Sequence, residues 1–223
     1  MNKTESPRQQ ALDWLKKSFL ELVSVFIAIM LALWVDEWHE EKQRKEKIEL
    51  AMSSVETELQ KNYRSLVVAH KHQTGSLELI HSFHKDNKSI NEELAESLHR
   101  QLYKRSMFHP SQLLDTAWQV LIRSQLMNYM DHQTILLYST HYNYQKELME
   151  SQKSHGQSMT LAAIQNDSYI SLMKIYAESI NNLWWRELHT FNSFRNLPSQ
   201  FFKDELKKHN ALKQQQEKSK IVE

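Results

Sequence analysis

The longest apolar run of the chain lies near its start, and the rest of the chain is polar or amphipathic. Residues 22–35 read LVSVFIAIMLALWV and contain no charge, glycine or proline. As a helix these roughly 14 residues rise about 21 Å, which is short of the span of about 20 residues that crosses a bilayer. A buried core helix or the core of a signal peptide fits this length equally well, so the flanking residues have to decide.

The flanking residues favour a helix in lipid. Extending the run back to residue 18 adds only one acid, Glu21. Trp14 precedes the run, and Trp34 and Trp38 close it. A helix holds these two groups of tryptophans roughly 30 to 36 Å apart, the spacing of two interfacial aromatic belts. The pattern predicts a transmembrane helix over residues 18–38, with these four side chains as its membrane anchor.

Glu21 itself has two interpretations. A carboxylate inside a bilayer is a functional candidate, for instance in a proton relay. However, Glu21 follows Lys17 by four residues and lies near the head-group level, where the two side chains pair and extend toward water. Pairing is the stronger interpretation.

The head, residues 1–17, is short and carries four bases against two acids. A basic head before an apolar run also describes a signal peptide, but no small-x-small cleavage site follows, which favours an uncleaved anchor. Four bases within residues 42–47 nearly balance the positive-inside rule, although the bases of the head lie closer to the run. We expect a single-pass protein of a bacterial inner membrane, with its body in the periplasm.

Residues 39–74 are expected to form a solvated stalk and then the first helix of a bundle. From residue 48 onward, a heptad-like seam recurs at steps of four and three. Its members are Ile48, Met52, Val55, Leu59, Asn62, Leu66 and Ala69. The seam fits a coiled coil with a second protomer or packing within the body, and the polar Asn62 favours the second.

Residues 75–206 are expected to form the helical bundle. Gly75 predicts the end of the first helix, and residues 76–84 a short second one. Ser89 with Glu92 three residues later has the spacing of a capping box that opens a third helix.

Further breaks divide the rest of the bundle. Pro110 predicts the first turn of a fourth helix. Asp131 is a candidate N-cap of the next helix, and Gly156 predicts its interruption. Ser199, after Pro198, is a candidate cap of a last helix. The tail, residues 207–223, is polar.

Composition supports an all-α fold. Two glycines and three prolines in 223 residues leave little material for hairpins, and helix-forming residues dominate. Without cysteine, disulfides and thiolate chemistry do not arise. Because 28 bases nearly balance 27 acids, the charge does not favour a nucleic-acid partner. The expected architecture is one N-terminal transmembrane helix continuing into a helical stalk and a soluble helical bundle.

Two patches of the sequence resemble a family of uncharacterised bacterial single-span membrane proteins. In the first patch, an acid precedes an apolar run that ends Ala-Leu, followed by Asn or Asp, any residue, Trp, any residue and Glu. The matching positions are Glu21, Ala32, Leu33, Asp36, Trp38 and Glu40. The second patch, residues 110–144, resembles the family's Thr-x-x-x-Leu-x-x-Ser core in part, through Thr116, Val120, Arg123 and Ser124. The resemblance implies an anchor and a helical body, and no chemistry.

A metal site is the sharpest enzymatic hypothesis. Glu78 with His81 and Glu96 with His99 form two Glu-x-x-His pairs, the spacing used by helical di-iron carboxylate proteins. With 12 histidines in the chain, about one such pair arises by chance, and further bridging carboxylates have no clear candidate. We therefore expect neither a metal nor another cofactor.

The sequence Trp184, Trp185, Arg186 is a candidate interface, because Trp and Arg are enriched in binding hot spots. Adjacent helical residues point about 100° apart, so one tryptophan is expected to be buried and the other partly exposed. Core packing of both is the simpler alternative.

Three functions follow from these patterns. The first is a membrane-anchored interaction or scaffolding protein without catalytic activity, which binds a protein partner or a second copy of itself. The second is a membrane-anchored sensor that binds a small ligand. The third is a metalloenzyme that uses the two Glu-x-x-His pairs.

Overall fold

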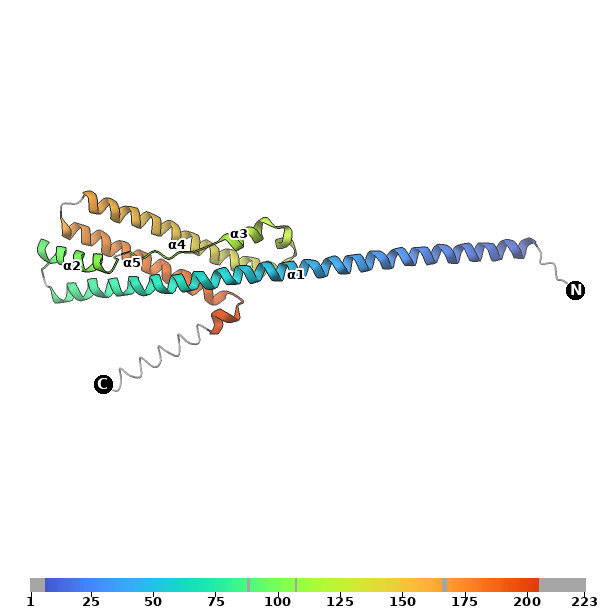
Figure 1. Ribbon diagram of the computed structural model, residues 1–223, viewed down its shortest axis with the longest axis horizontal. Helices are drawn as coiled ribbons and strands as arrows, with labels where there is room; N and C mark the ends of the chain where they lie inside the picture. The colour runs from blue at the N-terminus through green and yellow to red at the C-terminus, as the bar shows by residue number, and fades with distance from the viewer. Residues whose placement is uncertain (1–6, 88, 107, 166–167, 205–223) are drawn as a thin grey trace, which may run out of the picture. The chain divides into compact units, whose positions relative to one another are not determined.

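The computed structural model describes residues 7–87, 89–106, 108–165 and 168–204, with side chains from residue 17 onward. This part of the chain is helical and contains no strand, as expected (Figure 1). Its helices are α1 (Pro7–Asp86), α2 (Glu92–Lys104), α3 (Thr116–Arg123), η1 (Gln125–Tyr129), α4 (His132–Gln165), α5 (Tyr169–Ser193) and η2 (Phe194–Asn196). Residues 200–204 are also helical and begin directly after Ser199, the predicted cap. Residues 1–6 of the predicted head and all of the predicted tail, residues 207–223, lie outside the described residues.

The chain divides into two units, residues 1–50 and 51–223, and α1 contributes to both. In the first unit, nearly every described side chain is exposed. Two ion pairs along the helix, Arg44–Glu40 at 3.1 Å and Lys45–Glu41 at 2.7 Å, join side chains four residues apart. The stalk segment therefore has the solvated helical surface that its sequence predicts.

The second unit, the body, is built on residues 51–86 of α1 together with α4 and α5. Residues 58 and 62 of α1 bond to residues 142 and 145 of α4, so these two helices run parallel. Helix α5 runs antiparallel to both, because later residues of α1 and of α4 contact earlier residues of α5. Helices α4 and α5 lie side by side over most of their length (Figure 1).

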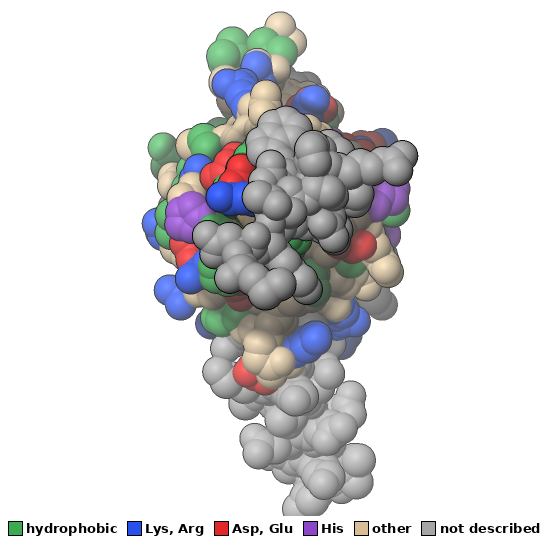
Figure 2. Space-filling model, turned by 90° about the vertical axis from the view of Figure 1, so that its right-hand side faces the viewer, with side chains coloured by type: hydrophobic (Ala, Val, Ile, Leu, Met, Phe, Trp, Pro, Cys, Tyr) green, Lys and Arg blue, Asp and Glu red, His purple; other side chains and the backbone are tan. Residues whose placement is uncertain are grey.

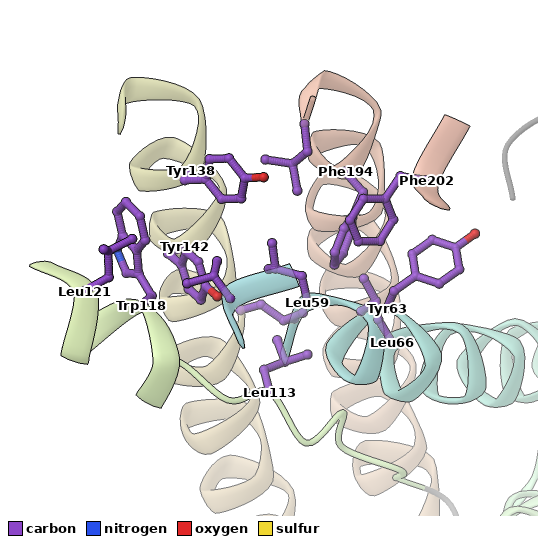
Figure 3. Packing of buried hydrophobic residues seen from close by; sticks show 13 residues of the cluster. Leu59, Tyr63, Leu66, Leu113, Trp118, Leu121, Tyr138, Tyr142, Phe194 and Phe202 are labelled. Carbon is purple, nitrogen blue, oxygen red and sulfur yellow. The ribbon is translucent and has the colours of Figure 1, made fainter. Parts of the chain in front are cut away.

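Two apolar clusters form the core of the body. The first cluster contains Leu59 and Tyr63 of α1, Trp118 of α3, Tyr142 of α4 and Phe194 of η2, together with further leucines and aromatics (Figure 3). The second joins Ile80 of α1 and Leu98 and Leu102 of α2 to Leu172, Met173, Tyr176 and Ile180 of α5. The seam from Val55 to Ala69 is buried in the body, which confirms the prediction of packing within the chain.

An extended segment, residues 108–115, takes the place of a helix between α2 and α3; we call it the strap. Extended backbone has no internal hydrogen bonds, so its polar groups need partners elsewhere. Asn62 of α1 meets both backbone groups of Leu114, donating to the carbonyl at 2.6 Å and accepting from the N–H at 2.8 Å. The Ser65 hydroxyl accepts from the N–H of Gln112 at 2.8 Å.

The strap leads directly into α3, and α1 holds this junction too. Asp115 makes no side-chain cap for α3. Instead, Glu58 of α1 accepts from the N–H of Ala117 through Oε2 at 2.8 Å, while its Oε1 accepts from Tyr142 of α4 at 2.7 Å. Polar residues of α1 thus bond to the strap and to the start of α3, and these bonds account for Asn62 in the seam without a second protomer.

The predicted end of the first helix at Gly75 is wrong, because α1 continues to Asp86 and includes residues 76–84. The buried seam also continues past Ala69, through Gln73, Ser76 and Ile80. Its two polar members obscured the pattern in the sequence. Burial of this whole face keeps α1 helical at Gly75, although the low helix propensity of glycine alone favours a helix end there.

Three other predicted helix starts and stops are also wrong. Asn91, not Ser89, caps α2, and its side chain accepts from the N–H of Leu94 at 2.9 Å. Pro110 lies in the strap, and α3 begins only at Thr116. Helix α4 passes through Gly156 and ends at Gln165. By contrast, Asp131 caps α4 as predicted, because its side chain accepts from the N–H of Thr134 at 2.8 Å.

Replacing Gly75 with alanine should stabilise the body by about 0.5–1 kcal/mol, because alanine is the better residue inside a helix. A Cβ at this position meets no atom within 4 Å. Urea unfolding of the full chain in detergent, followed by circular dichroism, measures the change. A loss of stability would contradict the continuous α1, since alanine would then be disfavoured at a real helix end.

Candidate functional site

One helix of the described chain is long and apolar enough to cross a membrane. No part of its apolar window is buried within the described structure. Ile27 and Leu31 at its middle are 52% and 55% exposed, and Phe19 and Leu33 near its ends are 67% and 61% exposed. Apolar side chains therefore stand free on every side of the helix, as a segment surrounded by lipid requires.

Three of the four predicted anchor residues can be located on this helix. Trp34 and Trp38 are 67% and 59% exposed, and Glu21 is exposed one to two turns before the apolar centre. The predicted ion pair of Glu21 with Lys17 is not among those that the described residues make. Trp14 belongs to α1, but its side chain lies outside the described part.

The four metal candidates are not brought together. Glu78 and His81 face solvent on α1. On α2, Glu96 pairs with Arg100 at 3.1 Å, and the ring of His99 lies 5.5 Å from that of Tyr169. Partial burial lowers the pKa of His99, and Glu96 opposes this effect. Among the described residues, no three His, Asp or Glu side chains are grouped closely enough to hold a metal ion.

The Trp184–Trp185–Arg186 trio is split between the inside and the surface. Trp184 packs inward, where its Nε1 donates to the Thr74 hydroxyl at 2.9 Å. Trp185 is 50% exposed, as the 100° offset predicts. Arg186 is exposed on α5 and lies 3.8 Å from Glu147 of α4. Trp185 and Arg186 are thus the two members of the trio that a partner can reach.

A buried polar cluster between α1 and α5 was not predicted. Glu187 of α5 is 0% exposed, and its Oε2 lies 3.5 Å from Nδ1 of His70 on α1. The ring of His70 stacks on that of Trp184 at 5.2 Å. Gln73 of α1 is also fully buried. Burial raises the pKa of Glu187, and the neighbouring His70, Gln73 and His72 oppose this rise.

A second polar network, in the first core cluster, is fully paired. Asn62 donates to Oε1 of Gln145 at 3.0 Å, which leaves the Gln145 amide nitrogen to donate to Nε2 of His141 at 2.6 Å. The Ser193 hydroxyl donates to the carbonyl of Thr190 at 2.6 Å, so His141 must donate to it through Nδ1–H, also at 2.6 Å. This order of donors fixes His141 as a neutral imidazole, and burial lowers its pKa to about 3.

The sequence did contain one signal for the missed cluster. The buried face of α5 repeats at steps of four and three through Tyr176, Ile180, Leu183, Glu187 and Thr190. A glutamate at a core position of such a repeat needs a polar partner. The partner positions on α1, His70 and Gln73, lay where the helix was expected to be ending.

Comparison with known proteins gives no relative. No family model, curated protein or solved structure matches this chain.

Proposed function

We propose that this chain is a single-pass membrane protein whose helical body acts by binding another protein, or a second copy of itself, and not by catalysis. The observation that carries the proposal is the exposed apolar helix around Ile27 and Leu31. The body completes both of its core clusters without this segment. An apolar surface of this size with no use in the fold is suited to lipid.

The composition of the body's surface is consistent with a soluble binding domain. Acidic, basic and apolar side chains are interspersed over the face that Figure 2 displays. The polar groups Glu58 and Asn62 bond to the strap and the start of α3, which is a structural role. Trp185 beside Arg186 is the most suitable contact for a partner, because an exposed indole next to a guanidinium supplies apolar area and directed donors together.

Photo-crosslinking tests this binding role. A photoreactive amino acid at position 185 of the full chain, in cells that naturally make the protein, should give one discrete adduct of higher mass. Position 136 is the matched control, because Leu136 is an apolar residue of α4 that is 57% exposed. Arg186→Glu should reduce the adduct at 185 severalfold by reversing the charge at the contact. Identical adducts from positions 185 and 136, or monomer alone from both, would contradict the proposal.

The proposed orientation places the head in the cytoplasm and the body in the periplasm of a bacterial cell. The bases of the head lie closer to the apolar run than those of the stalk. If the body lies outside, a protease added to intact spheroplasts should remove a tag placed at the C-terminus. Protection of the tag until the membrane is lysed would reverse the orientation.

A second candidate function is a sensor, and one observation favours it. Glu187 and Gln73 are fully buried polar residues whose side-chain oxygens have no hydrogen-bond partner. A scaffold needs no such group, whereas a sensor uses an unsatisfied site to respond to what binds there.

A further inference from the structure

The unpaired polar atoms of the body gather in one place. Six buried side-chain atoms in the described chain lack a hydrogen-bond partner, and all belong to His70, His72, Gln73, Ser76 and Glu187. Four of these residues follow one another along α1, and Glu187 faces them from α5. Buried polar atoms are normally paired, so their concentration in one cluster points to something that this cluster binds.

The chemistry of these atoms identifies what is missing. Both oxygens of Glu187 and Oε1 of Gln73 are acceptors. Nδ1 of His70 lies 3.5 Å from Oε2 of Glu187 and donates only when it carries hydrogen, and the nearby amide of Gln73 also favours the carboxylate. A buried carboxylate with two unpaired oxygens needs hydrogen from its surroundings. Since these residues do not form a metal-binding group, the smallest species that corrects the deficit is a proton.

We propose that Glu187 and His70 jointly hold one proton near neutral pH, and that this proton fastens α1 to α5. With one proton the pair has no net charge, whether the proton resides on the imidazole or on the carboxyl. Losing it leaves a buried carboxylate opposite a neutral ring; a second proton leaves a cation against the same apolar surroundings. This inference refines the sensor candidate and is independent of the membrane anchor.

The other charged and titratable groups around the pair are few. On α1, His72 bonds through Nε2 to the carbonyl of Arg105, and its ring lies 5.4 Å from that of His109, which comes from the strap. On the exposed side of α5, Arg186 pairs with Glu147 of α4 at 3.8 Å. His70 is 24% exposed at its side chain, which gives protons a path from solvent to the buried carboxyl.

The proton affects helix packing through Trp184. Its indole stacks on His70 at 5.2 Å and donates to Thr74 one turn later on α1. A change of charge on His70 or Glu187 therefore acts on the contact that holds these two helices together. Burial raises the pKa of Glu187 in the folded chain. Its contribution to stability is thus fully present below the unfolded pKa and is lost as the pH rises through the folded value.

A double-mutant cycle on the full chain in detergent tests the proposal. The variants are His70→Gln, Glu187→Gln and both together, each unfolded in urea between pH 4 and pH 9. Near neutral pH, the coupling between the two positions should change the unfolding constant by at least about tenfold. It should weaken toward both ends of this pH range, where the pair gains a second proton or loses the one it holds. Glu178→Gln, an exposed glutamate of the same helix, should show no coupling to His70.

A second readout avoids unfolding. The indole N–H signal of Trp184 in a nuclear magnetic resonance spectrum, assigned with Trp184→Phe, should shift with pH in the wild type. In Glu187→Gln, this signal should not show a shift with the same midpoint pH as in the wild type. A coupling that is zero, or that is equal at every pH, would overturn the proposal. So would a Trp184 signal that titrates identically in the wild type and in Glu187→Gln.

Discussion

Lowering the pH from 7 to 4 should cost the body about 3 kcal/mol of stability through His141 alone, because this side chain has to stay neutral in the folded state. His141 is 1% exposed, and burial lowers its pKa from 6.5 to about 3. The His141 side chain binds a proton below about pH 6.5 in the unfolded chain, but only below about pH 3 in the folded chain. The stability is therefore fully present above pH 6.5 and is lost as the pH falls.

Hydrogen bonding adds to this preference. Nε2 of His141 accepts from Gln145, so a second ring proton would oppose the amide hydrogens that already point at it. Gln145 cannot turn its amide without releasing Asn62. Burial and hydrogen bonding both favour the neutral ring of His141. Lowering the pH should therefore disrupt the first core cluster before it affects the exposed ion pairs.

Urea unfolding of the full chain in detergent at pH 7, 5.5 and 4 measures this loss. Glu187 acts in the opposite direction over the same range, so the informative quantity is the difference between the wild type and His141→Gln. The variant should lose most of the acid sensitivity, whereas His189→Gln, at an exposed position of α5, should retain it. Equal acid sensitivity in the wild type and His141→Gln would refute a neutral buried His141.

Replacing Asn62 with leucine should destabilise the body by about 3 kcal/mol, although leucine suits an apolar seam better than asparagine. Asn62 is 0% exposed and satisfies both backbone groups of Leu114 and the side-chain oxygen of Gln145. Leucine leaves all three unpaired inside the body. The cost of unpaired buried groups exceeds the gain from an added apolar side chain.

Two measurements check this prediction. Urea unfolding gives the loss of stability, and hydrogen exchange at the amide of Leu114 reports whether the strap is released from α1. Asn143→Leu is the matched control, because Asn143 is exposed on α4, and it should change the stability by less than about 0.5 kcal/mol. A more stable Asn62→Leu variant with a protected Leu114 amide would mean that the asparagine does not hold the strap.

The sequence predicted the parts of the fold that depend on apolar periodicity. The apolar run at residues 22–35 and the seam from Val55 to Ala69 both lie on the helix that their patterns indicate. The Asp131 cap was also predictable, because one side chain and one turn determine it. These features require only local physics.

The missed features depend on partners far away in the chain. Nothing near Pro110 shows that residues 108–115 stay extended, because the groups that satisfy this backbone are Asn62 and Ser65, on another helix. Gly75 predicts a helix end because glycine has a low helix propensity, and only the burial of residues 73, 76 and 80 within the body overrides it. Glu187 cannot be recognised as half of a pair from the sequence, because His70 becomes its neighbour only when α1 and α5 pack together.

Membrane fractionation with an alkaline carbonate wash tests the central claim, that residues 18–38 lie in lipid. The full chain should stay in the membrane pellet. Arginines at positions 27 and 31 together should release most of it, because each costs about 3 kcal/mol at the centre of a span. Arginines at the exposed positions 50 and 68, outside the apolar run, should not. A full-length chain that appears in the soluble fraction, or a doubly substituted span that stays in the pellet, would contradict the account.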